Sequence, residues 1–344
     1  MKLLVLGGTV FLGRHLVEAA QQHGHAVTIF HRGEHVAEGV RDVEVLRGDR
    51  DGGLDVLRGK TWDSVIDTSG YLPRVVRASA ELLADAVGHY SFVSTRSVYR
   101  DLGKPGVDES SKLAVIGDAD LSRMNALKNA PGMVRPDVGD HYGALKVLCE
   151  RAVEDVMGGA RTLITRPGLI VGPFDATDRF TYWPHRIAQG GEVLAPGRRD
   201  RTVSFLDARD YGEWLVRMAE GHKSGMFDVV GPTGWTMESV LSACREVGKS
   251  EATFTWVDEA FLLAHGVEPW TELPLWVKEE DRGALDAKND RALQAGLTFR
   301  SLETTARDVL AWDRTRAKDV VRKNGMKPER EAELLRAWHA RVTS

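Results

Sequence analysis

The sequence predicts an α/β fold in which a doubly wound parallel sheet is followed by a smaller C-terminal domain. The run Leu3-Leu4-Val5-Leu6 is apolar throughout, as expected of a strand that helices cover on both faces. Short β-rich runs then alternate with helical patterns as far as residue 165, which is typical of βαβ units. The chain has 344 residues, too many for one ordinary core.

Hydrophobic periodicity gives the expected elements in order. Strands are expected at 2–6, 26–30, 43–46, 64–67, 90–94 and 162–165, with helices around 12–20, 75–86 and 142–157. Residues 1–171 then form the first domain, and residues 172–344 form the second. Further strands are expected at 202–206 and 227–230, and we expect segments near 202–231 to return to the first domain. An amphipathic helix over 328–342 ends the chain.

Composition limits the class of protein. The 46 basic and 50 acidic residues are interspersed and give a net charge of −4, so neither nucleic acid nor a membrane surface is an expected partner. No run approaches a transmembrane span, and the first strand is too short for a signal peptide. The two cysteines, Cys149 and Cys244, fall in helical patterns and indicate reduced thiols. We therefore expect a soluble cytoplasmic protein without a metal site.

A glycine-rich turn joins the first strand to the first helix. Its sequence is Gly7-Gly8-Thr9-Val10-Phe11-Leu12-Gly13. In that position glycine permits a tight turn, the backbone can approach a pyrophosphate, and the helix N-terminus supplies N–H donors. We expect a dinucleotide to bind Gly7, Thr9, Phe11, Leu12 and Gly13. A plain turn between strand and helix is the alternative.

Two further segments carry reactive side chains. Tyr142 and Lys146 are four residues apart on an expected helix, so they share one face. A neighbouring ammonium favours the phenolate form of Tyr142, which suits it to proton transfer. Thr95 ends the fifth strand, where its hydroxyl could donate to a substrate oxygen.

Together these motifs resemble those of the extended short-chain dehydrogenase/reductases, a family of NAD(P)-dependent epimerases, dehydratases and reductases with a Rossmann-type fold. The likeness rests on the glycine turn, on Ser94-Thr95-Arg96-Ser97-Val98-Tyr99 and on Tyr142-Gly143-Ala144-Leu145-Lys146, in that order. It spans residues 1–232 well and implies that Thr95, Tyr142 and Lys146 form the catalytic group. Val10 departs from it, because the family usually has glycine there.

The resemblance also suggests how the cofactor is held. The second strand ends at His31 and Arg32, where an NAD enzyme places an acidic residue. Because Arg32 can pair with a 2′-phosphate, NADP(H) is favoured, and NAD(H) stays open. Asp49 is the candidate for the adenine contact, with helix capping as its alternative. The remaining expected cofactor contacts are Arg50, Ser69, Gly70 and Pro167, together with Tyr142 and Lys146 of the catalytic group.

The substrate side gives conflicting signals. Leu169 stands where nucleotide-sugar enzymes have an asparagine near the diphosphate, whereas Arg201 resembles an arginine that grips the diphosphate. Tyr71, Arg96 and Trp183 are the other candidate substrate residues. Tryptophans are frequent in this half of the chain and predict either an aromatic-lined pocket or ordinary core packing. Residues 101–140 form either a lid or a disordered insertion.

The sequence therefore favours an NADP-dependent oxidoreductase, a ketone or alcohol reductase or dehydrogenase, acting on a hydrophobic or aromatic small molecule. A nucleotide-sugar epimerase is the first alternative. A non-catalytic NADP- or RNA-binding protein is the second, and a homodimer is compatible with the sequence. Arg96 and Ser97 replace the Asp-Glu pair of sugar-nucleotide 4,6-dehydratases, which argues against dehydration.

Overall fold

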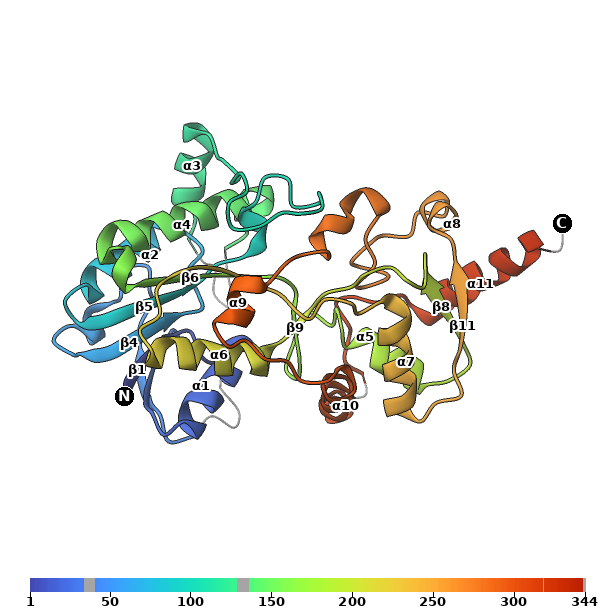
Figure 1. Cartoon of the computed structure of the whole chain (residues 1–344), viewed down its shortest axis with the longest axis horizontal. Coiled ribbons are helices and arrows are strands. Elements are labelled where there is room, and N and C mark those ends of the chain that lie inside the picture. Colours follow the sequence, from blue (N-terminus) through green and yellow to red (C-terminus); the bar gives the residue numbers. More distant parts are fainter. Residues whose placement is uncertain (34–40, 129–135, 318, 343–344) are drawn as a thin grey trace.

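The computed structural model describes residues 1–33, 41–128, 136–317 and 319–342. Figure 1 shows two units along the long axis of the molecule, a sheet flanked by helices on the left and a smaller unit on the right.

A seven-stranded sheet organises the first unit, in the order β10-β6-β5-β4-β1-β2-β3. All neighbouring pairs are parallel, which confirms the predicted fold class. The strands are β1 (Lys2–Leu6), β2 (Ala26–His31), β3 (Glu44–Arg47), β4 (Trp62–Asp67), β5 (Val87–Val93), β6 (Thr162–Pro167) and β10 (Gly225–Val229).

Helices cover both faces of this sheet. On one face α1 (Leu12–Gln22) packs against α6 (Ala208–Glu220), together with Leu3 and Val5 of β1. On the other face α2 (Pro73–Leu83) packs against α4 (Tyr142–Met157), together with Leu4 and Leu6. Successive side chains of a strand point to opposite faces, so the continuous apolar run in β1 serves both cores.

The described parts of the 101–140 segment pack onto this unit. Leu102, Val107 and Leu113 contact Val98 and Val147. The helix α3 (Asp118–Asn125) places apolar side chains in a second cluster that includes Leu72, Leu121, Met124, Val138 and Leu145. Residues 129–135 of the expected lid lie outside the described residues, and its closure over a ligand stays a prediction.

The second unit contains two short parallel strand pairs, β7 (Ile170–Val171) with β9 (Leu206–Asp207) and β8 (Glu192–Pro196) with β11 (Thr253–Val257). Its helices are α5 (Tyr182–Ala188), α7 (Met237–Gly248), α8 (Glu259–Ala264), α10 (Leu302–Asp313) and α11 (Pro328–Val342). The short helix α9 (Asp290–Gln294) packs instead against β10 of the first unit, where Ala292 joins the core. The predicted C-terminal helix is confirmed as α11.

The strand predicted at 202–206 is wrong over most of its length. Only Leu206 belongs to a strand, because the chain at Thr202 makes a single bridge to Thr236 and then buries Val203 and Phe205 in the core. From the segment near 202–231, α6 and β10 lie in the first unit.

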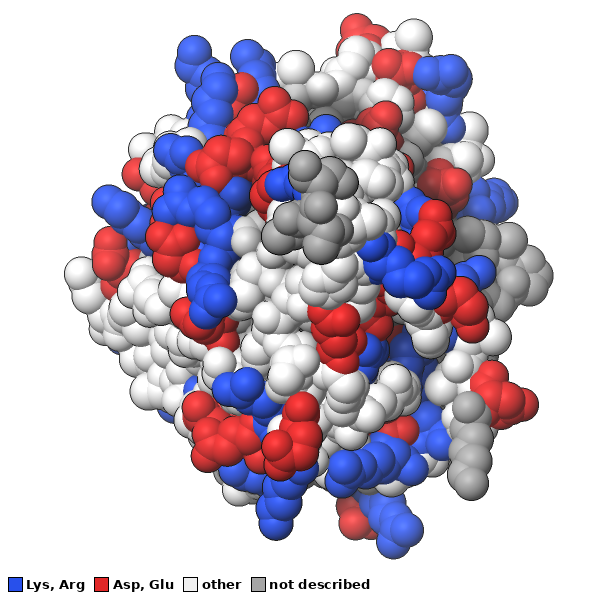
Figure 2. Space-filling view, turned by 90° about the vertical axis from the view of Figure 1, so that its right-hand side faces the viewer, with Lys and Arg blue, Asp and Glu red and all other residues white. Residues whose placement is uncertain are grey.

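The surface carries charges of both signs. Figure 2 shows the end of the molecule formed by the second unit, where basic and acidic side chains are interspersed. None of the described helices combines the length and apolar character needed to cross a membrane.

Candidate active site

A cleft of about 960 Å³ opens at the carboxyl edge of the sheet. The glycine turn after β1 and the segments after β2, β4, β5 and β6 line one side, because parallel strands all end at the same edge. Side chains of the second unit line the other side. A ligand bound there would touch both units.

The glycine turn has the close backbone contacts that a dinucleotide site needs. Gly7 and Gly8 have φ values of 109° and 90°, a region that disfavours other residues. A Cβ on Gly13 would lie 2.6 Å from both the nitrogen and the Cα of Gly8, so no side chain fits there. Among the described residues, no side chain makes a capping hydrogen bond at the N-terminus of α1, which leaves that helix end suited to a phosphate. The turn fits a pyrophosphate although Val10 replaces the usual glycine.

Beyond the turn, the cleft wall contains the residues expected to hold the adenosine end. His31, Arg32 and Asp49 all line it. The Asp49 carboxylate accepts a hydrogen bond from the Asp51 nitrogen at 2.8 Å, which holds the loop after β3. Arg50 also borders the cleft, but its guanidinium forms a buried pair with Asp67, at 2.6 and 2.5 Å.

Most of the other expected contacts also meet in this cleft. Its lining includes the five glycine-turn residues together with Ser69, Tyr71, Thr95, Arg96, Tyr142, Lys146, Pro167 and Leu169. Gly70 is not part of the lining. It lies behind the wall, where its carbonyl oxygen accepts a hydrogen bond from Lys146.

Lys146 is held rigidly beneath the cleft. Its side chain is buried, and Nζ donates to the carbonyl oxygens of Gly70 at 2.8 Å and Val93 at 2.7 Å. An ammonium has three donors, so one N–H remains for a group in the cleft. Burial lowers the pKa of Lys146 to about 8. The lysine is therefore fixed in position and titrates close to neutral pH.

The two hydroxyl-bearing residues lie in the same wall. The Tyr142 ring packs 6.4 Å from the Tyr71 ring, and Nζ of Lys146 lies 5.7 Å from that same Tyr71 ring. Thr95 follows β5 and begins a short 3₁₀ turn, where its Oγ1 accepts from the Ser97 nitrogen at 3.1 Å. Because that bond uses a lone pair, the Thr95 proton stays available for donation, and the Ser97 hydroxyl accepts it here at 3.3 Å.

A buried ionic network underlies the site and was not recognised from the sequence. Arg166 of β6 pairs with Glu150 of α4 through bonds of 3.0 and 2.7 Å, and the Ser94 hydroxyl donates to the same glutamate at 2.5 Å. The Tyr99 hydroxyl accepts from Arg166 at 3.1 Å and donates to Asp228 of β10 at 2.6 Å. The network ties β6, β10 and α4 to the end of β5, next to Thr95.

Arg96 belongs to this network. Its guanidinium pairs with Asp228 at 3.0 Å and donates to the Val107 carbonyl at 3.2 Å. Burial raises the pKa of Asp228 to about 6, against the opposing attraction of Arg96. Arg96 therefore forms part of the cleft wall, and the buried carboxylate of Asp228 balances its positive charge.

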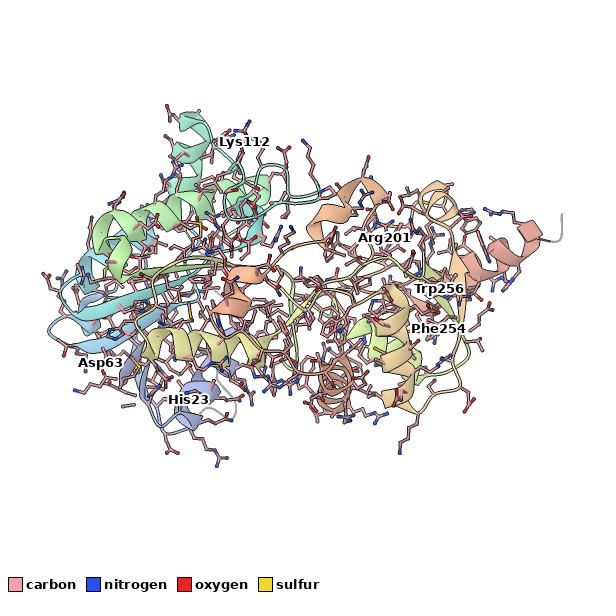
Figure 3. The ribbon with its side chains drawn as sticks, viewed as in Figure 1. His23, Asp63, Lys112, Arg201, Phe254 and Trp256 are labelled. Atoms are coloured by element: carbon pink, nitrogen blue, oxygen red, sulfur yellow. The ribbon has the colours of Figure 1, made fainter. Side chains whose placement is uncertain are left out.

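Two predicted substrate residues lie outside the cleft lining. Trp183 is fully buried in the core of the second unit, where its indole N–H donates to the Pro274 carbonyl at 2.8 Å. Arg201 pairs with Glu279 at 2.7 Å and Glu259 at 3.5 Å, and Figure 3 shows it in the second unit. The tryptophan fills the core, and the arginine neutralises two carboxylates.

Trp270, one of the tryptophans that suggested an aromatic-lined pocket, lines the cleft from the second unit. The second unit also supplies cleft residues that the sequence did not indicate, which are Asp175, Ala176, Thr177, Arg179, Ala284, Leu285, Lys323 and Asn324. The Asp175 carboxylate accepts from the nitrogen and hydroxyl of Thr177, at 2.9 and 2.7 Å, and its pKa is raised by burial. Asn324 donates to the Thr177 carbonyl at 2.7 Å. No short motif joins residues so distant in the chain, so no sequence signal was available.

Comparison with known proteins supports this arrangement at the level of the fold. No family model and no curated protein matches the chain. Among solved structures, UDP-Glc/GlcNAc 4-epimerase from Campylobacter jejuni superposes with a TM-score of 0.65 at 14% identity, covering 92% of this chain and 99% of the other. UDP-glucuronic acid 4-epimerase from Bacillus cereus, in complex with NAD, superposes with a TM-score of 0.59 at 17% identity, covering 91% of this chain and 96% of the other.

A dTDP-glucose 4,6-dehydratase from Bacillus anthracis, also in complex with NAD, superposes with a TM-score of 0.62 at 13% identity and covers 92% of this chain and 98% of the other. The chain has the fold of these enzymes. The fold expected from the resemblance to extended short-chain dehydrogenase/reductases is thereby confirmed over both units.

Proposed function

We propose that this chain is a nicotinamide-dependent sugar epimerase, which removes a hydride from a hydroxyl-bearing carbon and returns it to the opposite face. The observation that carries the proposal is the meeting of Thr95, Tyr142 and Lys146 in one cleft with the glycine turn. The sequence favoured a simple reductase instead. The fold comparisons favour the epimerase, because the three neighbours above are two sugar epimerases and a sugar dehydratase.

Each residue of the group has a task that its position allows. The bound dinucleotide would accept and return the hydride. Tyr142 would take the proton of the substrate hydroxyl and later return it. Lys146, held by two carbonyl oxygens, would stabilise the phenolate with its positive charge. Thr95 would donate to the same substrate oxygen and fix its position.

The polar wall of the second unit suits a hydroxylated substrate. Asp175, Thr177 and Asn324 bring carboxylate, hydroxyl and amide groups to the cleft. A sugar carries several hydroxyls that must find partners when they leave water. Elimination of water is not part of the proposal, because Ser97 is no acid and Arg96 is paired with Asp228.

Reduction of a hydrophobic carbonyl compound is the second candidate. Leu169, Trp270 and Leu285 give part of the cleft an apolar lining, and Arg201 is engaged elsewhere. The preference for NADP(H) expected from Arg32 also stays a prediction. The two complexes named above contain NAD.

A panel assay separates the two candidates. UDP- and dTDP-sugars are incubated with the protein and either NAD⁺ or NADP⁺, and epimers are resolved chromatographically. Aromatic and polycyclic ketones are tested in parallel by consumption of NADPH and NADH. The proposal predicts epimer formation without net cofactor turnover, lost in Tyr142→Phe while cofactor binding persists. Ketone reduction without any epimerisation would establish the second candidate instead.

A further inference from the structure

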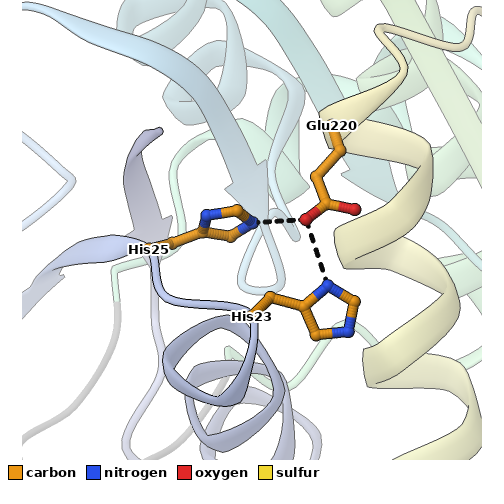
Figure 4. A group of neighbouring side chains, drawn as sticks. All are labelled: His23, His25 and Glu220. Carbon is orange, nitrogen blue, oxygen red and sulfur yellow. Dashed lines mark hydrogen bonds and ion pairs between the residues drawn. The ribbon is translucent and has the colours of Figure 1, made fainter.

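A cluster of two histidines and one glutamate lies at the opposite edge of the sheet from the cleft. His23 follows the last residue of α1, His25 directly precedes β2, and Glu220 is the last residue of α6. Gly24, with φ of 76°, turns the chain between the two histidines. Figure 4 shows both imidazoles directed at the same carboxylate.

The two distances from Glu220 to the histidines are close to those between ligand atoms around a single metal ion. Oε1 of Glu220 lies 3.0 Å from Nδ1 of His23 and 2.8 Å from Nε2 of His25. All three ligand atoms lie within 4.8 Å of one another. Ligand atoms about 2.1 Å from one ion are separated by about 3.0 Å at right angles and by about 3.4 Å in a tetrahedron. Small side-chain movements would therefore admit an ion.

Two imidazoles and one carboxylate form a donor set for zinc and related first-row ions, whereas calcium and magnesium prefer oxygen ligands alone. His23 and Glu220 keep exposed side-chain fractions of 30% and 35%, so water could complete the coordination. Among the described residues, no other group of three or more His, Cys, Asp or Glu side chains has suitable spacing.

The backbone around the cluster is hydrogen-bonded, and two helix ends there favour a cation. The His25 nitrogen donates to the Ala20 carbonyl, and the Ala26 nitrogen donates to the Met1 carbonyl, both at 3.0 Å. The C-terminal ends of α1 and α6 both lie at the cluster, and helix C-termini carry partial negative charge that attracts cations. The Met1 amino group lies 3.4 Å from Nδ1 of His25, and its positive charge opposes the binding of a cation.

We propose that His23, His25 and Glu220 form a zinc-binding site that links the end of α1 to the end of α6. The site is independent of the cleft, because the glycine turn lies at the other end of α1. Zinc bound there would stabilise the fold without entering the proposed reaction, since it would bind the folded chain and not the unfolded one.

The test uses the full chain without a histidine tag. Zinc chloride is titrated by calorimetry into the unmodified protein and into His23→Gln and Glu220→Gln. The matched control is His339→Gln, because His339 pairs with Glu192 at 2.6 Å without a second histidine. Melting curves without metal show that each variant is folded, and magnesium chloride serves as the hard-cation control.

One zinc ion per chain is expected for the unmodified protein and for His339→Gln. The melting temperature should rise by about 4 °C when free zinc is 100 times its Kd. Removing a residue that only hydrogen-bonds to a metal ligand typically weakens metal binding by roughly 10- to 100-fold. Each ligand variant removes a ligand itself, so its affinity for zinc should fall by more than that. The proposal would be overturned if the unmodified protein bound no zinc, or if both ligand variants bound zinc as tightly as the unmodified protein.

Discussion

Replacing Lys146 with methionine tests the electrostatics of the site through folding stability. Methionine keeps a linear apolar side chain of similar length but removes the ammonium. In the folded chain that ammonium is almost completely buried, with 2% exposure, and burial lowers its pKa to about 8 from 10.5. In the unfolded chain the lysine keeps its ordinary pKa and holds its proton more tightly than in the folded chain. The buried positive charge therefore opposes folding at neutral pH.

The sign and size of the effect follow from proton linkage. Between pH 8 and 10.5 the unfolded state binds more protons, so stability rises with pH in that window. With these two pKa values, the cost of the buried ammonium falls by about 2.5 kcal/mol between pH 7 and pH 10. The carbonyl groups of Gly70 and Val93 lose their donor in the variant at both pH values, so that loss cancels from the comparison.

Urea denaturation at pH 7 and pH 10 measures this difference for the unmodified protein and for Lys146→Met. The unmodified protein should gain about 2.5 kcal/mol relative to the variant as the pH rises. Lys112→Met is the matched control, because Lys112 is exposed and should show little change. A difference independent of pH, or one of opposite sign, would refute the claim that burial destabilises the ammonium.

Three further predictions concern the network, the hydroxyl and the cofactor. Glu150→Gln should lower the free energy of unfolding by about 3–5 kcal/mol, because Arg166, with 1% side-chain exposure, loses its countercharge. A loss below about 1 kcal/mol in urea denaturation would contradict this. Thr95→Ala should lower turnover by about 10²-fold with unchanged cofactor affinity, and full turnover would remove its proposed role. Arg32→Asp should weaken binding of NADP more than of NAD in calorimetry, and equal weakening would argue against the 2′-phosphate contact.

Local sequence signals predicted the first unit well. The apolar run of β1 required cover on both faces, and both cores receive alternate residues of that strand. The helix expected over 142–157 is α4 with the same bounds, which places Tyr142 and Lys146 on one helical face as their spacing indicated. Motifs within one strand, turn or helix were readable because the spacing itself determines their geometry.

The second unit was harder to predict because its contacts join distant parts of the chain. Arg201 resembled a phosphate-binding arginine, yet Glu259 and Glu279 neutralise it from segments far along the sequence. Trp183 contributes to a core rather than to the cleft, and composition could not separate these roles. Lys323 enters the cleft lining from the region near the C-terminus, which no local pattern indicates.

Binding of a nicotinamide dinucleotide to the glycine turn is the central claim, and calorimetric titration of Gly13→Ala tests it most directly. A Cβ on Gly13 would lie 2.6 Å from the Gly8 backbone, whereas a Cβ on Gly159, the control position, meets no atom within 4 Å. NAD⁺ and NADP⁺ are each titrated into the unmodified protein and both variants. The account predicts one dinucleotide per chain in the unmodified protein and Gly159→Ala, with binding lost in Gly13→Ala. Equally tight binding by Gly13→Ala, or no binding by the unmodified protein, would contradict it.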